Sequence, residues 1–298
     1  MNGLTMPEEP TYEFIKAYAN ITPYRVSFNE LAKKTFGLDF EDWYQNGFWG
    51  ENYIPYSLLD GDRVIANISV NITDFDCEGE LRHYIQLGTV MTDEKYRGQG
   101  LIRRLMQEIE KDYGEGTDGF YLFANDSVLD FYPKFGYAPA EEYKYFKEVK
   151  QEGRCRVKPV PMKEEKAWDS FVKIMQKSVV NSRFKMQGNT DLIMFYITKF
   201  MQENVFYIED ADTYVIAELE EGELILGDIF AKKQVDIHKI IEAFGSSVRR
   251  ATLNFTPLET EGFQIKRLQE ADTTLFVKGK KIQEISQRRF MFPTLSHA

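Results

Sequence analysis

The sequence has few of the residues from which disulfide frameworks and metal sites are built. Its 298 residues include two cysteines and three histidines. Cys77 and Cys155 stand outside any CxxC or Cys/His cluster, so we expect two free thiols and no bound metal. Free thiols persist in a reducing compartment, and we therefore expect a cytoplasmic protein.

The sequence also lacks an excess of positive charge and any long apolar segment. Acidic residues outnumber basic ones by 47 to 37, which gives a formal net charge of −10. Nucleic-acid binding needs concentrated Lys and Arg, so we exclude a nucleic-acid partner. No window of about 18 residues is apolar throughout, and the N-terminus has no basic stretch followed by an apolar one. We therefore expect neither a membrane span nor a secretory signal.

The apolar residues that are present suffice for more than one hydrophobic core. Hydrophobic residues make up 43% of the sequence and charged residues 28%, as in folded globular proteins. At roughly 150 residues per domain the length corresponds to about two domains, with one exceptionally large domain as the alternative. Dense charge and two prolines within residues 141–161 predict a boundary, which divides the chain into residues 1–150 and 151–298. All of the excess acid lies in the first part, which has 26 acidic and 15 basic residues.

Hydrophobic periodicity in the first half predicts a mixed α/β arrangement. The expected order is two helices, an antiparallel meander of three strands that turns first at Asp60-Gly61, a long amphipathic helix, a buried strand and a short helix. We expect Asp39 to cap the second helix and Pro133 to interrupt the short one. These elements fall in residues 22–37, 39–49, 53–72, 81–91, 101–114, 119–125 and 127–137.

The second half repeats this order in outline. Two helices, a strand pair, a helix and a strand are expected in residues 166–180, 189–202, 213–230, 235–245 and 250–258. The agreement predicts a tandem of two similar folds, although residue identity between the halves is low. The ending RRFMFPTLSHA is apolar enough to dock onto the body of the protein.

The segment QLGTVMTDEKYRGQGLIRRLMQEI combines a strand, a glycine-containing basic turn and a helix. Gly98 and Gly100 let the backbone turn tightly and approach a ligand, while the amides of the first helical turn point outward unpaired. The helix dipole and the cations Arg97, Arg103 and Arg104 add to the attraction, so we expect a phosphate or pyrophosphate here. The segment is neither a P-loop, which needs GxxxxGK[ST], nor a dinucleotide fingerprint, since Arg103 stands at the third glycine position.

This segment resembles the GNAT superfamily of acetyl-CoA-dependent N-acyltransferases, in which R/Q-x-x-G-x-G/A follows a strand and opens a helix. The matching positions are Arg97, Gly98, Gln99, Gly100, Leu101 and Ile102, and the one departure is Ile102, where the family usually has Gly or Ala. Downstream, ANDSVLDFYPKFGY is similar to the second signature of the family, an Asn followed by an FYxxxGF-like helix and turn. The resemblance covers residues 23–147 and implies a GNAT fold.

The resemblance also implies acetyl-CoA as cosubstrate and roles for particular residues. The backbone of Val90 and Met91 would pair with the pantetheine arm, and the amides from Arg97 to Ile102 would hold the pyrophosphate. Asn125 would hydrogen-bond the cosubstrate near its pantetheine section, and Tyr132 would return a proton to the departing CoA thiolate. An amine would attack the thioester directly, with the oxyanion held by a strand amide such as that of Met91.

Several of these side chains have a purely structural alternative. Tyr132 could pack its ring beneath the short helix, and Asn125 could cap that helix, a role compatible with cosubstrate binding. Glu80 and His83 are candidates for the base that deprotonates the amine, and a chain of water molecules is the alternative. The acidic residues Asp74, Asp76, Glu78 and Glu80 could line a pocket for a cationic amine or form a solvated hairpin turn.

The second half has no R-x-x-G-x-G. Its corresponding segment, AKKQVD, lacks glycine, so we expect a degenerate, non-catalytic GNAT-like domain that shapes the acceptor site. This resembles two-domain bacterial members of the family of the mycothiol-synthase type. The leading hypothesis is an N-acetyltransferase acting on the primary amine of a small cationic acceptor. The alternative is a non-catalytic acyl-CoA-binding or sensing protein, and the possibility of a homo-oligomer stays open.

Overall fold

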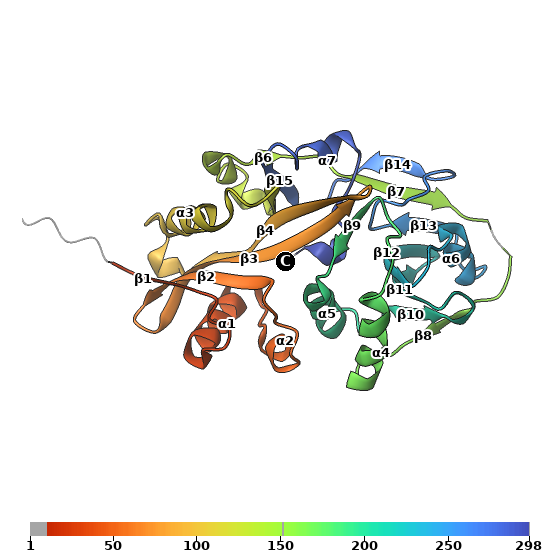
Figure 1. Cartoon of the computed structure of the whole chain (residues 1–298), viewed down its shortest axis with the longest axis horizontal. Helices are drawn as coiled ribbons and strands as arrows, with labels where there is room; N and C mark the ends of the chain where they lie inside the picture. The colour runs from red at the N-terminus through yellow and green to blue at the C-terminus, as the bar shows by residue number, and fades with distance from the viewer. Residues whose placement is uncertain (1–10, 151, 298) are drawn as a thin grey trace, which may run out of the picture.

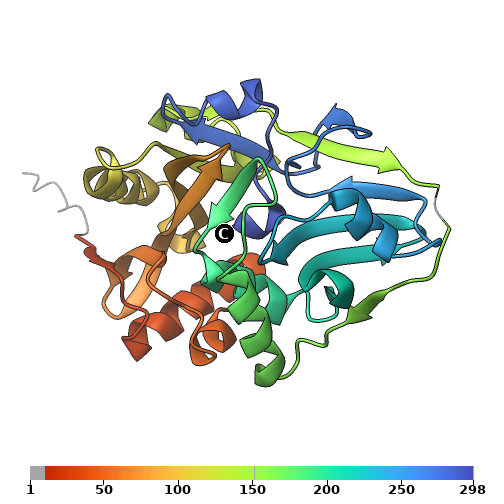
Figure 2. The same ribbon diagram turned by 45° about the vertical axis from the view of Figure 1, so that its right-hand side comes forward.

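Two mixed β-sheets lie side by side in the computed structural model, which describes residues 11–150 and 152–297 (Figures 1 and 2). The first half of the chain forms β1 (Glu13–Lys16), α1 (Thr22–Phe36), α2 (Glu41–Gln45), β2 (Tyr53–Asp60), β3 (Arg63–Cys77), β4 (Glu80–Thr92), η1 (Glu94–Tyr96), α3 (Leu101–Tyr113), β5 (Gly119–Ala124), η2 (Asp126–Val128), η3 (Tyr132–Phe135), β6 (Ala138–Pro139) and β7 (Tyr143–Glu148). The second half forms β8 (Val157–Pro159), α4 (Glu165–Met175), β9 (Phe184–Gln187), α5 (Thr190–Lys199), β10 (Val205–Ile208), η4 (Glu209–Ala211), β11 (Thr213–Glu220), β12 (Glu223–Ala231), α6 (Ile237–Ala243), β13 (Arg250–Leu253), β14 (Gln264–Arg267), β15 (Thr274–Lys278), α7 (Glu284–Gln287) and η5 (Thr294–Ser296).

Most of the elements predicted in the first half are confirmed. The meander β2–β3–β4 is antiparallel, and β5 joins β4 in parallel. α1 ends at Phe36, and Gly37 follows with a left-handed φ of 72°. α3 buries Leu101, Leu105 and Ile109 against one face of the first sheet, while α1 and α2 cover the other face. The predicted α/β arrangement is therefore correct.

Two local predictions are wrong. α2 begins at Glu41 behind Phe40, not behind Asp39, whose carboxylate lies 3.7 Å from the Lys199 amino group of α5. The short helix expected after β5 is two 3-10 turns, η2 and η3. Pro133 is the second residue of η3 and does not interrupt a helix, because proline fits the first turn, where its missing N–H is not needed.

The two sheets exchange strands between the halves. The first sheet has the order β1-β2-β3-β4-β5-β15-β6, with β9 beside β3, and the second has the order β14-β7-β13-β12-β11-β10-β8. In each sheet a helix connects two parallel strands, α3 between β4 and β5 and α6 between β12 and β13. The next position is filled from the other half, by β15 antiparallel to β5 and by β7 antiparallel to β13. The division at residue 150 thus stays a prediction about folding units, since each sheet contains strands from both sides of it.

A shared core joins the halves and the C-terminal segment. It contains, among others, Phe75, Tyr84 and Tyr121 of the first sheet, Phe171, Ile216 and Phe230 of the second half, and Phe290, Phe292 and Leu295 of the C-terminal segment. The predicted docking of this segment is confirmed, because Phe292 stacks on Tyr121 with ring centroids 4.0 Å apart. Figures 1 and 2 show the segment reaching the middle of the molecule, between the two sheets.

Neither cysteine forms a disulfide. Cys77 is buried and Cys155 is exposed, so the prediction of two free thiols is confirmed. Among the helices of the described residues, none is both long and apolar enough to cross a membrane.

Candidate functional site

The first sheet opens where β4 and β5 separate. These parallel strands pair only from Tyr84 opposite Gly119 to Gln86 opposite Tyr121. Farther along β4 the ladder to β3 shifts register between Gly88 and Met91, and Thr89 has a positive φ of 47°. A bulge of this kind re-aims the backbone, and a strand edge without a partner strand offers N–H and C=O groups to an extended ligand.

A cavity of about 760 Å³ lies at this opening and is built by both halves of the chain. From the first half it is lined by Thr35, Phe36, Leu38, Phe40, Trp43, Tyr53, Leu87, Gly88, Thr89, Val90, Met91, Thr92, Arg97, Ile102, Phe123, Ala124, Asn125, Ser127, Val128, Phe131 and Tyr132, and from the second half by Leu192, Phe195, Tyr196, Phe200 and His297. Of the predicted site residues, Val90, Met91, Arg97, Ile102, Asn125 and Tyr132 are thereby brought together.

The glycine turn before α3 has the geometry of an anion site. Gly98 and Gly100 have φ values of 79° and 74°, and a Cβ at either position would meet no atom within 4 Å. Gly100 is the N-cap of α3, and among the described residues no side chain caps this helix end, so the first-turn amides of Leu101 and Ile102 have no side-chain acceptor there. An open, uncapped helix N-terminus attracts phosphate oxygens.

Asp93 is the N-cap of η1, the 3-10 turn that directly precedes the glycine turn. It is buried, lies 2.6 Å from Arg63 and 3.4 Å from Lys34, and accepts the Lys95 amide. Burial opposes ionisation, but these donors and cations outweigh it and lower the pKa of Asp93. The turn is therefore held by a charged group that stays ionised at neutral pH.

The three arginines around the turn do not all face the cavity. Arg97 lines it and donates from Nε to the Thr92 carbonyl at 3.4 Å. The Arg103 guanidinium lies 5.3 Å above the Phe135 ring, and Arg104 donates to the Tyr12 carbonyl at 2.8 Å. Gln99 accepts a hydrogen bond from the hydroxyl of Tyr12. Arg97 thus supplies the positive charge at the cavity wall.

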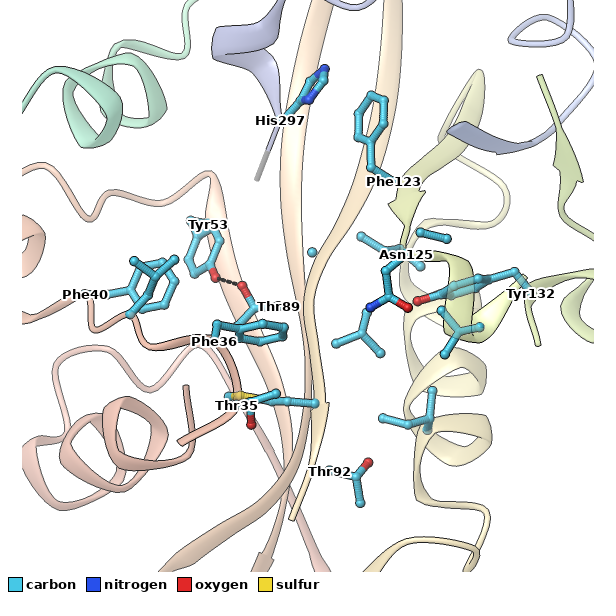
Figure 3. A pocket seen from close by; sticks show the side chains of 18 of the residues that line it. Thr35, Phe36, Phe40, Tyr53, Thr89, Thr92, Phe123, Asn125, Tyr132 and His297 are labelled. Atoms are coloured by element: carbon cyan, nitrogen blue, oxygen red, sulfur yellow. Dashed lines mark hydrogen bonds between the residues drawn. The ribbon is translucent and has the colours of Figure 1, made fainter. Parts of the chain in front are cut away.

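Asn125 and Tyr132 point toward one another on one side of the strand that carries Thr89 (Figure 3). Asn125 caps η2 as expected, since its Oδ1 accepts from the amide and hydroxyl of Ser127 at 3.2 and 2.5 Å. Its Nδ2 remains as a donor. The Tyr132 ring is buried, and burial raises the pKa of its hydroxyl to about 12. Within residues 11–150 and 152–297 that hydroxyl has no hydrogen-bond partner, so both predicted side chains keep a polar group for a ligand.

Glu80 and His83 lie at the other end of β4. Glu80 is exposed and pairs with Arg82, and the ring of His83 is 2.6 Å from Asp74. Neither residue lines the cavity, so the structure gives neither of them access to a thioester held there. β4 is thirteen residues long, so side chains near its first residue lie far from the cavity at its other end.

His297 is a cavity residue that the sequence analysis missed. Its ring stacks on Phe123 with centroids 3.7 Å apart, and Nε2 is shielded from solvent with no partner among the described residues. Burial lowers the pKa of His297 to about 4, although the ring also donates to the Phe292 carbonyl, so the imidazole is neutral at pH 7. The available signal was a histidine, one of three in the chain, within the ending predicted to dock onto the body of the protein.

The N-terminus of α6 contrasts with that of α3. At the corresponding connection in the second sheet, Asp236 is the N-cap and its carboxylate accepts the His238 and Lys239 amides at 2.8 and 3.4 Å. A side-chain carboxylate therefore already occupies the position where an anion would bind.

A cavity between separated strands, next to an open helix N-terminus, suits a ligand that carries phosphate. Residues 18–137 match the acetyltransferase (GNAT) family, so the first half of the chain contains a GNAT domain. None of the curated proteins matches the chain in sequence.

Solved structures resemble nearly the whole chain in fold. A conserved protein of unknown function from Enterococcus faecalis V583, described as a probable N-acyltransferase, has a TM-score of 0.58 and 15% identity over 93% of this chain and 74% of its own. A GCN5-related N-acetyltransferase from Kribbella flavida gives 0.52 and 14% over 89% and 71%, and Eis1 from Mycobacterium abscessus gives 0.51 and 10% over 89% and 72%. At these identities the likeness establishes the tandem fold alone.

Proposed function

We propose that the protein transfers an acetyl group from acetyl-CoA to the primary amine of a small acceptor, in the reducing environment of the cytoplasm. The observation that carries the proposal is the meeting of three features at one cavity: the free edge of β4, the uncapped glycine turn before α3, and the unpartnered hydroxyl of Tyr132.

The residues of the first half fit acetyl-CoA. The backbone of Val90 and Met91 would pair with the pantetheine arm, and the amides from Arg97 to Ile102 would bind the pyrophosphate beside the Arg97 cation. The Nδ2 group of Asn125 would donate to the pantetheine section. These assignments follow the family resemblance and are supported by the open space over the turn.

The chemistry proposed is direct attack of a neutral amine on the thioester carbonyl. The Met91 amide would stabilise the oxyanion, the carbon–sulfur bond would break, and the proton from Tyr132 would neutralise the departing thiolate, while the proton lost by the amine nitrogen would pass to solvent water. A pKa of about 12 keeps Tyr132 protonated at neutral pH, as a proton donor must be. We assign no side chain as base, because Glu80 and His83 lie away from the cavity.

The second half would shape the acceptor side without catalysing a reaction of its own. It contributes α5 and the C-terminal segment to the cavity wall. The Asp236 carboxylate at the N-terminus of α6 would repel a pyrophosphate, which supports a single acetyl-CoA site in the tandem.

The test is release of free thiol from acetyl-CoA over a panel of amines, with equilibrium binding of CoA measured in parallel. The panel contains polyamines, aminoglycosides, amino acids, peptides and arylalkylamines. Thiol release that depends on an amine supports the proposal. Tight CoA binding with no amine-dependent release over the whole panel would instead support a non-catalytic acyl-CoA-binding protein.

A further inference from the structure

Aromatic rings form the wall of the cavity across β4 from Tyr132. Figure 3 shows Phe36, Phe40 and Tyr53 gathered on this side of the strand. Phe40 stacks on Phe195 of α5, with centroids 5.3 Å apart and an interplanar angle of 15°. The stack joins the first half to the second, so the wall is a continuous apolar surface built by both halves.

Two of the aromatic rings at the cavity remain in contact with solvent. Phe36 at the end of α1 is 46% exposed, and Phe200 after α5 is 52% exposed, and both line the cavity. Large apolar side chains left in water at the edge of a concave site mark a surface that a ligand covers.

Among the residues that the structure describes, none provides the cavity with a side-chain carboxylate that could receive a cation. No aspartate or glutamate is among its lining residues in the described parts of the chain, and Arg97 is the one side chain there that is charged at pH 7. A second ammonium group on an acceptor would be desolvated without a counter-ion and beside a guanidinium.

Several acidic groups on the neighbouring elements are already engaged, and Asp191 of α5, whose carboxyl pKa is raised by burial, does not line the cavity. Glu41 of α2 accepts from Arg25 at 3.0 Å, and Asp39 and Asp42 both lie 3.7 Å from the amino group of Lys199. At the acid-rich hairpin Asp74 contacts His83, and Glu78 of that turn pairs with cations. The acid-rich hairpin, which had suggested a cationic acceptor, thus does not line the cavity.

We propose that the acceptor carries its primary amine on a flat aromatic body, which lies against Phe36, Phe40 and Phe195 while the amine reaches the end of β4. This inference rests on the acetyltransferase function proposed above and names the acceptor class. The amine would enter in its neutral form, since the wall offers ring faces and hydroxyls in place of a carboxylate.

The first experiment compares matched amines at saturating acetyl-CoA. We expect 2-phenylethylamine to have a kcat/KM at least about tenfold above that of 1,4-diaminobutane and of an aminoglycoside, because ring burial favours the first and unpaired charge disfavours the others. A preference for the diamine or the aminoglycoside would overturn the inference and leave the acetyltransferase function standing. Absence of thiol release with every amine would overturn both.

The second experiment places a charge on the wall at a half-exposed position that folding tolerates. Phe36→Glu should lower kcat/KM for 2-phenylethylamine by about tenfold or more and raise it for 1,4-diaminobutane, with the KM for acetyl-CoA unchanged. Val26→Glu is the matched control, because Val26 is 45% exposed on the same helix and does not line the cavity. It should leave both amines unaffected.

A long acyl chain on the CoA donor would also suit an apolar wall. A third measurement distinguishes this use of the wall from binding of an aromatic acceptor. Octanoyl-CoA and acetyl-CoA are compared as donors with one amine. Preference for acetyl-CoA supports the inference. A preference for octanoyl-CoA that Phe36→Glu removes would assign the wall to the acyl chain and overturn it.

Discussion

Tyr132 meets a structural and a chemical requirement at the same position. Its ring packs against Phe276 and Tyr137, with centroids 5.8 and 6.2 Å away, while its hydroxyl lies at the cavity without a protein partner in the described chain. The two readings of this residue, core aromatic and proton donor, are therefore compatible.

Replacing Tyr132 with Phe keeps the packing and removes the proton donor. We expect kcat to fall by about 10²-fold or more, as for the loss of a general acid, while the Kd for CoA stays within about twofold. Thiol-release assays measure kcat, and calorimetric titration measures the Kd for CoA. Tyr137→Phe is the control, since Tyr137 is equally buried and does not line the cavity. Equal turnover in the two variants would remove Tyr132 from the mechanism.

Glu142 makes the stability of the C-terminal segment depend on pH. It is buried and accepts the Phe292 amide at 2.7 Å, and burial raises its pKa to about 8. Its protonated form is therefore favoured in the folded state, so stability is complete below its unfolded pKa and declines as pH rises toward 8.

Between pH 5 and pH 8 the free energy of unfolding should fall by up to about 1.4 kcal/mol per pH unit through this group. Glu142→Gln retains an acceptor for the Phe292 amide and should flatten that slope. Urea unfolding at several pH values measures it. The same slope in both proteins would show that Glu142 ionises normally in the folded state.

Residues of the cavity differ in how far the sequence reveals them. Arg97, Asn125 and Tyr132 belong to local signatures, whose spacing along the chain carries the geometry with it. Phe195 and His297 reach the cavity only because α5 and the C-terminal segment pack onto the first half, a long-range contact that no local pattern encodes. Glu80 and His83 do not line the cavity, since a place on the motif strand does not bring a side chain to the cavity end of that strand.

At the scale of elements, two helix N-termini with different caps distinguish the halves. Gly100 leaves the amides of α3 open, whereas Asp236 closes those of α6. The sequence reveals this difference, because glycines precede α3 whereas the corresponding segment AKKQVD has none. The periodicity of α3 was equally readable, but the 3-10 turns after β5 were not, because short turns depend on packing more than on period.

Gly100→Ala tests the open helix end. An L-residue at φ 74° is strained, so the free energy of unfolding should fall by roughly 1 kcal/mol. If the first-turn amides bind pyrophosphate, relief of that strain displaces them and the Kd for CoA should rise about tenfold. Gly79→Ala carries the same backbone strain at φ 89°, in the hairpin at the far end of β4, and should leave the Kd unchanged. Equal CoA affinities would contradict an anion site at this turn.

For the whole molecule, the sequence predicted the tandem but not the way its halves are joined. Helices, hairpin, helix and strand recur in both halves with their local signals intact. β15 pairs with β5, and β7 pairs with β13, across sequence separations far beyond any periodic pattern. Strands of four to six residues are too short for their own sequence to specify a partner strand. The partner is set only when a sheet with a free edge has formed.

Because each sheet contains strands from both halves of the chain, we expect that neither half folds alone. Residues 1–150 would lack β15 at the edge of β5 and would expose β7 without a partner strand, together with the Phe75, Tyr84 and Tyr121 surface of the shared core. We expect this fragment to lack a cooperative thermal transition and to bind no CoA, measured by circular dichroism and calorimetry. The control is the full chain with a protease site inserted in the exposed segment at residues 152–154 and then cut, which keeps every strand and should retain both properties. A 1–150 fragment that melts cooperatively and binds CoA would show that the first half is an independent domain, for which the pairing of β15 with β5 is dispensable.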